Sequence, residues 1–469
     1  MRHPELLVPA SCLEVLKTAV IFGADAVYIG GEAYGLRAKA KNFSMAQMAE
    51  GIVFAHEHDV KVYVTANIFA HNRDLEGIEA YFQELKELRP DALIIADPGV
   101  FMIAKRVCPE IERHISTQAN NTNYETCRFW WEQGAKRVVS ARELSLAELR
   151  ELRVKIPSEM EIETFVHGAM CISYSGRCLL SNYFTGRDAN QGACTHPCRW
   201  KYAIVEETRP GEYLPIEENE RGTYIFNSKD LCMIEHIPDL LEAGIDSFKI
   251  EGRMKTALYV ATVARTYRRA IDDCLKDRAL YEKNLPWYRS QISNCTYRQF
   301  TTGFFYGKPA QESQIYDSNT YIKEYTYLGI IGERIEEQPA GTDRKSIQDD
   351  SDKTETLPCV HSGADCDRDA RNTSRFVPAH GNGAGQEKLE STEAGSTSSW
   401  YRIEQRNKFS VGETIEVMKP DGRNLQATVL GIRDEEGYPM ESAPHPKQKL
   451  WVELSCNAEK FDLLRRAEG

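Results

Sequence analysis

Short apolar segments alternate with longer amphipathic segments over the first 270 residues of the chain. Eight of the apolar segments are typical of strands: Leu6–Ser11, Asp25–Gly31, Val60–Phe69, Asp91–Gly99, His114–Asn121, Lys136–Leu144, Glu161–Ala169 and Ser247–Gly252. Most of them are largely apolar, as expected of strands that are covered on both faces.

The segments between these strands have helical periodicity. Two of them begin at a capping serine, Ser44 before Met45–His56 and Ser145 before Leu146–Leu152. No glycine-rich dinucleotide-binding turn accompanies the alternation, which favours a closed (β/α)8 TIM-like barrel over a doubly wound sheet. We therefore expect an α/β protein whose residues 1–295 form a TIM-like barrel domain.

The pattern changes after Cys295 to short alternating strands, seen in 320–336, 408–420, 424–439 and 449–455. These segments predict a small C-terminal β-barrel domain made of residues 296–337 and 400–469. Residues 338–399 are rich in Ser, Thr, Asp, Gly and Glu and have almost no apolar periodicity. They predict a disordered insertion within the second domain.

The length, the hydrophobic fraction and the net charge of the chain limit the kinds of function that it can have. The chain has 469 residues, of which 42% are hydrophobic, enough for two domains with cores of their own. Its formal charge of −12 argues against broad nonspecific binding of nucleic acid, so an RNA substrate would need a local basic patch. The basic run Lys255–Lys283, with interleaved tyrosines, is one candidate, although a solvated outer helix of the barrel is the favoured interpretation.

The compartment follows from two further patterns. No apolar run reaches the roughly 18 residues that span a bilayer, so we expect no membrane segment. The chain opens directly into folded-looking sequence, without the pattern of a signal peptide. We expect a cytoplasmic protein, in which 13 cysteines stay reduced and some of them hold a metal.

Four cysteines gather in one glycine-punctuated stretch, Glu163–Tyr202: Cys171, Cys178, Cys194 and Cys198. A disulfide knot needs an oxidising compartment. Structural zinc prefers paired Cys-x2-4-Cys knuckles. Only Cys194 and Cys198 have that spacing, because six residues separate Cys171 from Cys178. An iron–sulfur cluster accepts uneven spacing, so the pattern favours iron–sulfur, with zinc second. Small buried thiols are a further interpretation, which the crowding in one loop disfavours.

Polar side chains stand at the ends of the predicted strands, where TIM barrels carry their chemistry. They are Asn67, Gln118, Asn120, Arg142, His167, Lys249, Glu251 and Arg253. Arg142 and Arg253 are candidates to clamp a dicarboxylate, because guanidinium pairs carboxylates bidentately. His167 is a candidate for proton transfer, with a buried core histidine as the alternative. Glu251 either orients Arg253 or acts as a base.

Several separated motifs occur in a recognisable order. They are Glu163-x-Phe165-x2-Gly168-Ala169-Met170-Cys171, Gly176-x-Cys178, Asn190-x-Gly192-x-Cys194-x2-Pro197-Cys198-Arg199, Asn227–Cys232, Ile250–Lys255 and Phe300–Phe305. The set resembles the signature of the collagenase-like peptidase family U32. The resemblance runs from Leu6 to about Tyr327 and resumes near Tyr401.

Within that family the chain is most similar to the branch that hydroxylates the wobble uridine of tRNA. The resemblance implies tRNA as the substrate, 5-hydroxyuridine as the product, prephenate rather than oxygen gas as the co-substrate, and a 4Fe-4S cluster. It also implies a ligand set of Cys171, Cys178, Cys194 and Cys232, with Cys198 as the spare or the replacement for Cys232. Related branches hydroxylate a ribosomal RNA base or a ubiquinone precursor.

Two other classes of function stay open at this point. A U32-type peptidase would need an activated nucleophile or a metal-bound water, yet the chain contains no Gly-x-Ser-x-Gly and no His-Glu-x-x-His. A zinc-stabilised binding module would leave the polar strand-end residues without a role.

Overall fold

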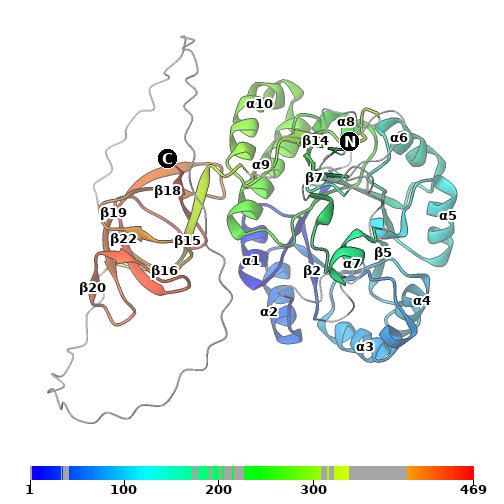
Figure 1. Cartoon of the computed structure of the whole chain (residues 1–469), viewed down its shortest axis with the longest axis horizontal. Helices are drawn as coiled ribbons and strands as arrows, with labels where there is room; N and C mark the ends of the chain where they lie inside the picture. The colour runs from blue at the N-terminus through cyan, green and yellow to red at the C-terminus, as the bar shows by residue number, and fades with distance from the viewer. Residues whose placement is uncertain are drawn as a thin grey trace.

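In the computed structural model, two barrels lie beside one another, drawn blue to green and yellow to red in Figure 1. The structure describes residues 3–32, 34, 42–171, 174, 178–187, 189, 193–199, 203–204, 214–215, 227–307, 314–315, 322–336 and 399–468. Of the predicted insertion, residues 338–398 lie outside these ranges. Ser399 is the first residue of a strand of the second barrel.

The first barrel consists of eight parallel strands in one closed sheet, which confirms the predicted TIM-like fold. The strands are β1 (Glu5–Pro9), β2 (Ala26–Gly30), β3 (Lys61–Ala66), β4 (Ala92–Ile95), β5 (Glu112–Ile115), β6 (Arg137–Val139), β7 (Glu161–Gly168) and β12 (Ser247–Ile250). They follow chain order, and β12 closes the sheet by pairing with both β7 and β1. Ser247 is opposite Glu163 on one side and Glu5 on the other.

Helices surround these strands, as Figure 1 shows. They are α1 (Leu13–Ile21), α2 (Met45–His56), α3 (Ile78–Leu88), α4 (Pro98–Val107), α5 (Tyr124–Gln133), α6 (Leu146–Lys155), α8 (Ile237–Glu242) and α9 (Ala257–Lys276). The capping serines are confirmed, because Ser44 and Ser145 each form a capping box with the third helical residue. Before α3, Leu75 ends the short 3-10 helix η1 (Asn72–Leu75), and Gly77 precedes α3 in a left-handed conformation.

The basic run forms two helices, α9 and α10 (Arg278–Ser293), and its charges are largely engaged within the protein. Most of α9 is buried, because it packs on α1 and β1 and also contacts the second barrel. Arg265 is buried and donates to the Lys419 carbonyl at 2.7 Å, while Arg268 pairs with Asp25 at 2.6 Å. These contacts favour the structural interpretation of this run over a phosphate-binding surface.

Extra segments cover the end of β7. Strand β11 (Asp230–Cys232) pairs antiparallel with β7, and β13 (Phe300–Thr301) pairs with β11. Residues 300–301 therefore belong to the first barrel's sheet, which differs from the predicted domain boundary near 295. The same region holds α7 (Leu180–Thr185), η3 (Pro197–Arg199) and the strand pairs β8 (Ala203–Ile204) with β9 (Leu214–Pro215) and β10 (Asn227–Ser228) with β14 (Gln314–Ile315).

The second barrel is antiparallel and closed, which confirms the predicted C-terminal β-barrel fold. Its strands are β15 (Tyr325–Ile335), β16 (Ser399–Gln405), β18 (Thr414–Met418), β19 (Asn424–Arg433), β22 (Lys449–Leu454) and β23 (Leu463–Ala467). The short strands β17 (Phe409–Ser410), β20 (Pro439–Met440) and β21 (Ser442–Ala443) lie at its margins. Pairing of β18 with β19 closes the sheet. Its core includes the buried side chains of Leu328, Tyr401 and Val452.

Specific contacts hold the two barrels together. The Tyr327 hydroxyl donates to the Glu14 carboxylate at 2.8 Å, and Arg406 pairs with the same carboxylate. The rings of Phe54 and Phe461 meet edge to face, 5.8 Å between centroids. Across the described residues, none of the helices combines the length and the apolar character that crossing a membrane requires.

Candidate active site at the C-terminal end of the barrel

The C-terminal ends of β3 and β5 carry buried amide side chains. Asn67 follows β3, and its Nδ2 donates to the Ser116 hydroxyl at 3.3 Å. Gln118 lies in the 3-10 helix η2 (Thr117–Ala119), with Asn120 directly after it. Neither Gln118 Oε1 nor Asn120 Oδ1 has a hydrogen-bond partner among the described residues. A buried acceptor without a partner is costly, so these oxygens are suited to accept from a bound ligand.

Arg142 and Glu251 meet across the end of the barrel. Arg142 follows β6 and Glu251 follows β12, and their Nη2 and Oε2 atoms lie 3.4 Å apart. The Arg142 guanidinium stands 4.0 Å from the centroid of the Phe165 ring and donates to the Ala169 carbonyl at 3.1 Å. Gly168 permits this close approach of β7 and β12, because a Cβ there would lie 2.4 Å from the Glu251 carbonyl oxygen. The Arg142 contact was not predicted from the sequence, and the two predicted roles of Glu251, orienting Arg253 or acting as a base, stay predictions.

Arg253 is a second buried guanidinium at this end, and its side chain is 6% exposed. It donates to the Thr65 hydroxyl at 3.1 Å and to the Asn42 side-chain oxygen at 3.0 Å. Gly30 makes room for it, because a Cβ on Gly30 would lie 2.5 Å from Nη1. A buried guanidinium of this kind is chemically suited to bind a carboxylate ligand. The carboxylate clamp of Arg142 and Arg253 stays a prediction.

We expect Gly30→Ala to displace the Arg253 guanidinium and to lower activity about tenfold, because a misplacement of about 1 Å at a reacting centre can be costly. Gly51→Ala is the matched control, since its Cβ would press on Leu16 in the helical layer, 2.9 Å away, and not on the site. The measurement is the rate at which each variant forms 5-hydroxyuridine in tRNA, the product that the sequence resemblance implies. The melting temperatures of the two variants are compared to show that both are folded. Equal rates for the two variants would contradict the role of Gly30.

His167 lies between the barrel wall and α9. Its ring is fully buried and packs near Tyr259, Tyr267 and Phe300, with Nδ1 3.4 Å from the Tyr267 hydroxyl. Burial lowers the pKa of His167 to about 3, although Asp230 opposes the shift. A neutral histidine of such low basicity is a poor proton acceptor at neutral pH. This geometry favours the core alternative, and proton transfer by His167 stays a prediction.

The five candidate ligand cysteines lie on segments that adjoin the end of β7. Cys171 is exposed three residues beyond β7, Cys178 precedes α7, and Cys198 lies in η3. The Cys194 sulfur accepts from the His196 backbone amide at 3.4 Å. Cys232 is the register partner of His167, and its sulfur lies 3.8 Å from the Tyr267 hydroxyl. Burial raises the pKa of the Cys232 thiol to about 12.

These thiols form no metal-binding group in the described part of the chain, where no three or more His, Cys, Asp or Glu side chains are placed to hold one metal ion. The iron–sulfur assignment stays a prediction that rests on the sequence motifs.

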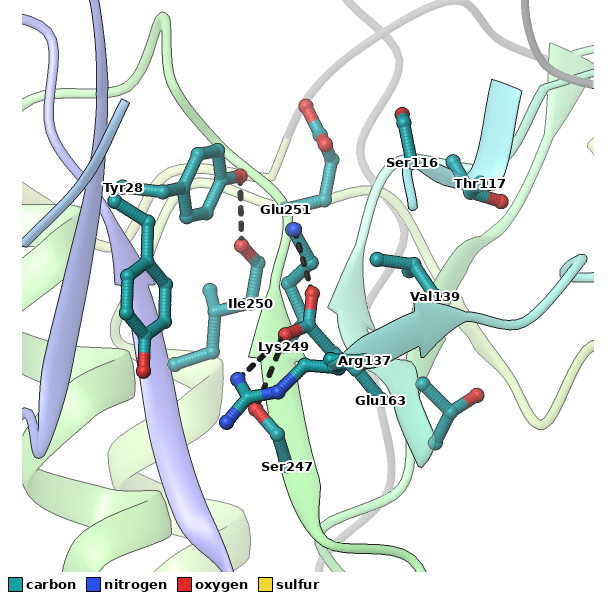
Figure 2. A network of polar contacts seen from close by, with 12 residues as sticks. Tyr28, Ser116, Thr117, Arg137, Val139, Glu163, Ser247, Lys249, Ile250 and Glu251 are labelled. Atoms are coloured by element: carbon teal, nitrogen blue, oxygen red, sulfur yellow. Dashed lines mark hydrogen bonds and ion pairs between the residues drawn. The ribbon is translucent and has the colours of Figure 1, made fainter. Parts of the chain in front are cut away.

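The interior of the barrel below this end contains a network of charges that the sequence analysis missed (Figure 2). Glu163 is fully buried and accepts from Lys249 at 2.6 Å and from Arg137 at 3.0 Å. Arg137 also pairs with Glu5 at 2.6 Å and with Glu161 at 2.6 Å. Burial by itself would raise the pKa of the Glu163 carboxyl, but Lys249 and Arg137 more than offset it and hold this pKa low.

The network supports the residues above it. The Lys249 ammonium lies 4.6 Å from the Tyr28 ring centroid and 5.5 Å from that of Phe165, the ring on which Arg142 stacks. Tyr28 in turn donates to the Ile250 carbonyl at 3.0 Å, the dashed line at the upper left of Figure 2. One signal was available in the sequence: Glu161 and Glu163 alternate with Ile162 in β7, and Ser247 and Lys249 alternate with Phe248 in β12.

The match to known families covers both barrels. Residues 11–315 match the model of peptidase family U32, and residues 389–465 match that of the peptidase family U32 C-terminal domain. The chain belongs to peptidase family U32. The family recognised from the cysteine motifs is thereby confirmed.

Curated members of the U32 family match this chain along its length. The tRNA hydroxylation protein P1 of Bacillus subtilis is 36% identical over all of this chain and 96% of its own. The tRNA hydroxylation protein P of Escherichia coli is 34% identical over 99% of this chain and 97% of its own. The 23S rRNA 5-hydroxycytidine C2501 synthase of Escherichia coli is 36% identical over 58% of this chain and 40% of its own.

Proposed function

We propose that this U32 protein is an RNA-modifying hydroxylase, and that its reaction converts the wobble uridine of tRNA to 5-hydroxyuridine. The observation that carries the proposal is the match along both barrels to relatives named tRNA hydroxylation proteins. A third relative is named for hydroxylation at the 5 position of a pyrimidine in ribosomal RNA, which supports the same chemistry on an RNA base.

The proposal includes prephenate as co-substrate in place of oxygen gas. Prephenate carries two carboxylates, which the guanidinium groups of Arg142 and Arg253 are chemically suited to bind. Arg253 donates to the side chains of Thr65 and Asn42, which hold its guanidinium at this end of the barrel. Arg142 would have to exchange part of its contact with Glu251 for the ligand.

The proposal also includes a 4Fe-4S cluster on Cys171, Cys178, Cys194 and Cys232, with Cys198 as the alternative fourth ligand. Such a cluster would supply electron transfer. The segments carrying these cysteines adjoin the end of β7, which supports the choice of ligands. Binding would release the proton of each ligand thiol, Cys232 included.

Complementation tests the proposal. A bacterial strain lacking 5-hydroxyuridine in its tRNA would receive the wild-type chain, Cys171→Ala or the control Cys274→Ala, whose cysteine is partly buried on α9. We expect mass spectrometry of tRNA nucleosides to show 5-hydroxyuridine with wild type and control and at least a tenfold loss with Cys171→Ala. The anaerobically purified wild type should contain iron and absorb near about 400 nm.

Absence of 5-hydroxyuridine with the expressed wild-type chain would overturn the hydroxylase proposal. Full modification by an iron-free protein would overturn the cluster alone. Cleavage of gelatin by the purified chain, abolished by one substitution outside the five cysteines, would instead support the peptidase interpretation.

A further inference from the structure

The short helix α7 presents three large apolar side chains to solvent at the end of the barrel. The exposed fractions are 83% for Tyr183, 74% for Leu179 just before the helix, and 45% for Phe184. The rings of Tyr183 and Phe184 meet edge to face, 5.3 Å between centroids. Single exposed apolar residues are ordinary on protein surfaces, but a group of neighbours including two aromatic rings indicates a binding surface.

The opposite face of α7 is fixed to the cysteine-rich segment. The Ser181 hydroxyl is fully buried and accepts from the Thr195 backbone amide at 3.0 Å. The Thr185 hydroxyl donates to the Ser181 carbonyl at 2.7 Å and lies 3.3 Å from the Thr195 hydroxyl. Because these hydrogen bonds orient the helix, its aromatic face is held outward by the fold.

The location and charge of α7 restrict its partner. In Figure 1 this helix lies inside the ring formed by the outer helices, across the barrel strands. It follows β7 and so belongs to the C-terminal end, where Arg142, Glu251 and Arg253 lie. Residues 179–187 contain no Asp or Glu and end with Arg187, directly before Asp188, within a chain of net charge −12. The helix itself therefore places no negative charge against a polyanion.

We propose that the aromatic face of α7, made of Leu179, Tyr183 and Phe184, is a stacking platform for unpaired nucleotides of the substrate RNA. Exposed aromatic rings bind single-stranded RNA by stacking on its bases, whereas a duplex keeps its bases stacked on one another. The platform would hold the nucleotides beside the target base while that base enters the end of the barrel. The inference rests on the proposed RNA-modifying function and identifies where the RNA binds.

Fluorescence anisotropy with the full-length chain tests the platform. The probes are a fluorescein-labelled 12-nucleotide oligouridine and a labelled 12-base-pair RNA duplex. Stacking of one base on an aromatic side chain accounts for roughly 5- to 150-fold in affinity, so we expect Tyr183→Ala/Phe184→Ala to bind oligouridine at least tenfold more weakly. Duplex binding should not change. Tyr183→Trp, which keeps an aromatic ring, should bind oligouridine like wild type.

Phe129→Ala is the matched control, because Phe129 is an aromatic residue 49% exposed on the outer helix α5. It should leave both affinities unchanged. Unchanged oligouridine binding by the α7 double variant, equal losses for both probes, or no binding by wild type would each overturn the platform. A wild-type dimer in sedimentation that the double variant abolishes, with RNA affinity unchanged, would assign the face to self-association instead.

The same proteins separate the platform from the proposed function. If wild type binds oligouridine through α7 but does not restore 5-hydroxyuridine in the complementation strain, the platform stands and the hydroxylase proposal fails. If wild type and the α7 double variant restore 5-hydroxyuridine equally, the hydroxylase proposal stands and the platform fails.

Discussion

Glu163→Ala is expected to destabilise the first barrel by about 3–5 kcal/mol, the usual cost of leaving a buried charge without its partner. The variant removes the carboxylate that accepts from Lys249 at 2.6 Å and from Arg137 at 3.0 Å. Arg137 keeps Glu5 and Glu161, whereas Lys249 has no other ion-pair partner in the described part of the chain. The measurement is urea unfolding followed by circular dichroism at 222 nm, since the described helices all belong to the first barrel.

The double variant Glu163→Leu/Lys249→Met is the control, because it removes both charges of the buried pair and keeps apolar volume. We expect the double variant to lose clearly less unfolding free energy than Glu163→Ala, because Arg137 retains Glu5 and Glu161 and no isolated charge is left. If Glu163→Ala lowers the unfolding free energy by less than about 1 kcal/mol, or by as much as the double variant does, the Glu163–Lys249 pair does not hold the network together.

The first barrel is expected to lose about 2 kcal/mol of unfolding free energy between pH 7 and pH 5 through His167 alone. The folded chain protonates this histidine only near pH 3, because burial lowers its pKa from 6.5 to about 3. The unfolded chain takes up the proton below about pH 6.5, so acid favours unfolding throughout this window. Burial, with the nearby Arg137 charge, also lowers the pKa of His114, which acts in the same direction.

His167→Phe isolates the contribution. The substitution keeps an aromatic ring among Tyr259, Tyr267 and Phe300 and removes the titrating group. Urea titrations of His167→Phe at pH 7 and pH 5 should show a decrease in unfolding free energy that is smaller by about 2 kcal/mol than in wild type. The control is His445→Phe, on an exposed residue of the second barrel, which should show the same decrease as wild type. An unchanged drop in His167→Phe would mean that His167 is not held neutral by the fold.

A buried, neutral His167 also bears on the chemistry. The proposed hydroxylation needs groups that move protons or bind anions at the barrel end, and the described candidates there are Arg142, Glu251 and Arg253. The Arg142–Glu251 contact and the buried Arg253 guanidinium are both placed by strand-end loops that follow β6 and β12. The ion network below them connects the stability of the barrel core to the position of Phe165 and so of Arg142.

Local patterns in the sequence determined the architecture. Eight apolar segments separated by helices predicted the closed parallel barrel, because strands covered on both faces have few polar positions. Ser44 and Ser145 predicted helix starts, since a capping serine acts within one helical turn. The cysteine motifs predicted the family, and the ends of the strands predicted that Arg142, Glu251 and Arg253 lie at one end of the barrel.

Only the tertiary structure decided which side chains contact one another across different strands and helices. Glu5, Arg137, Glu163 and Lys249 come from four strands, and only closure of the sheet brings their charges within hydrogen-bonding distance. Closure also pairs Glu251 with Arg142 and turns His167 toward α9, where burial removes its charge. The outward aromatic face of α7 depends on hydrogen bonds to Thr195, ten or more residues away in the chain. Periodicity reports which positions are buried along one element, whereas pairing across elements depends on distances that the fold sets.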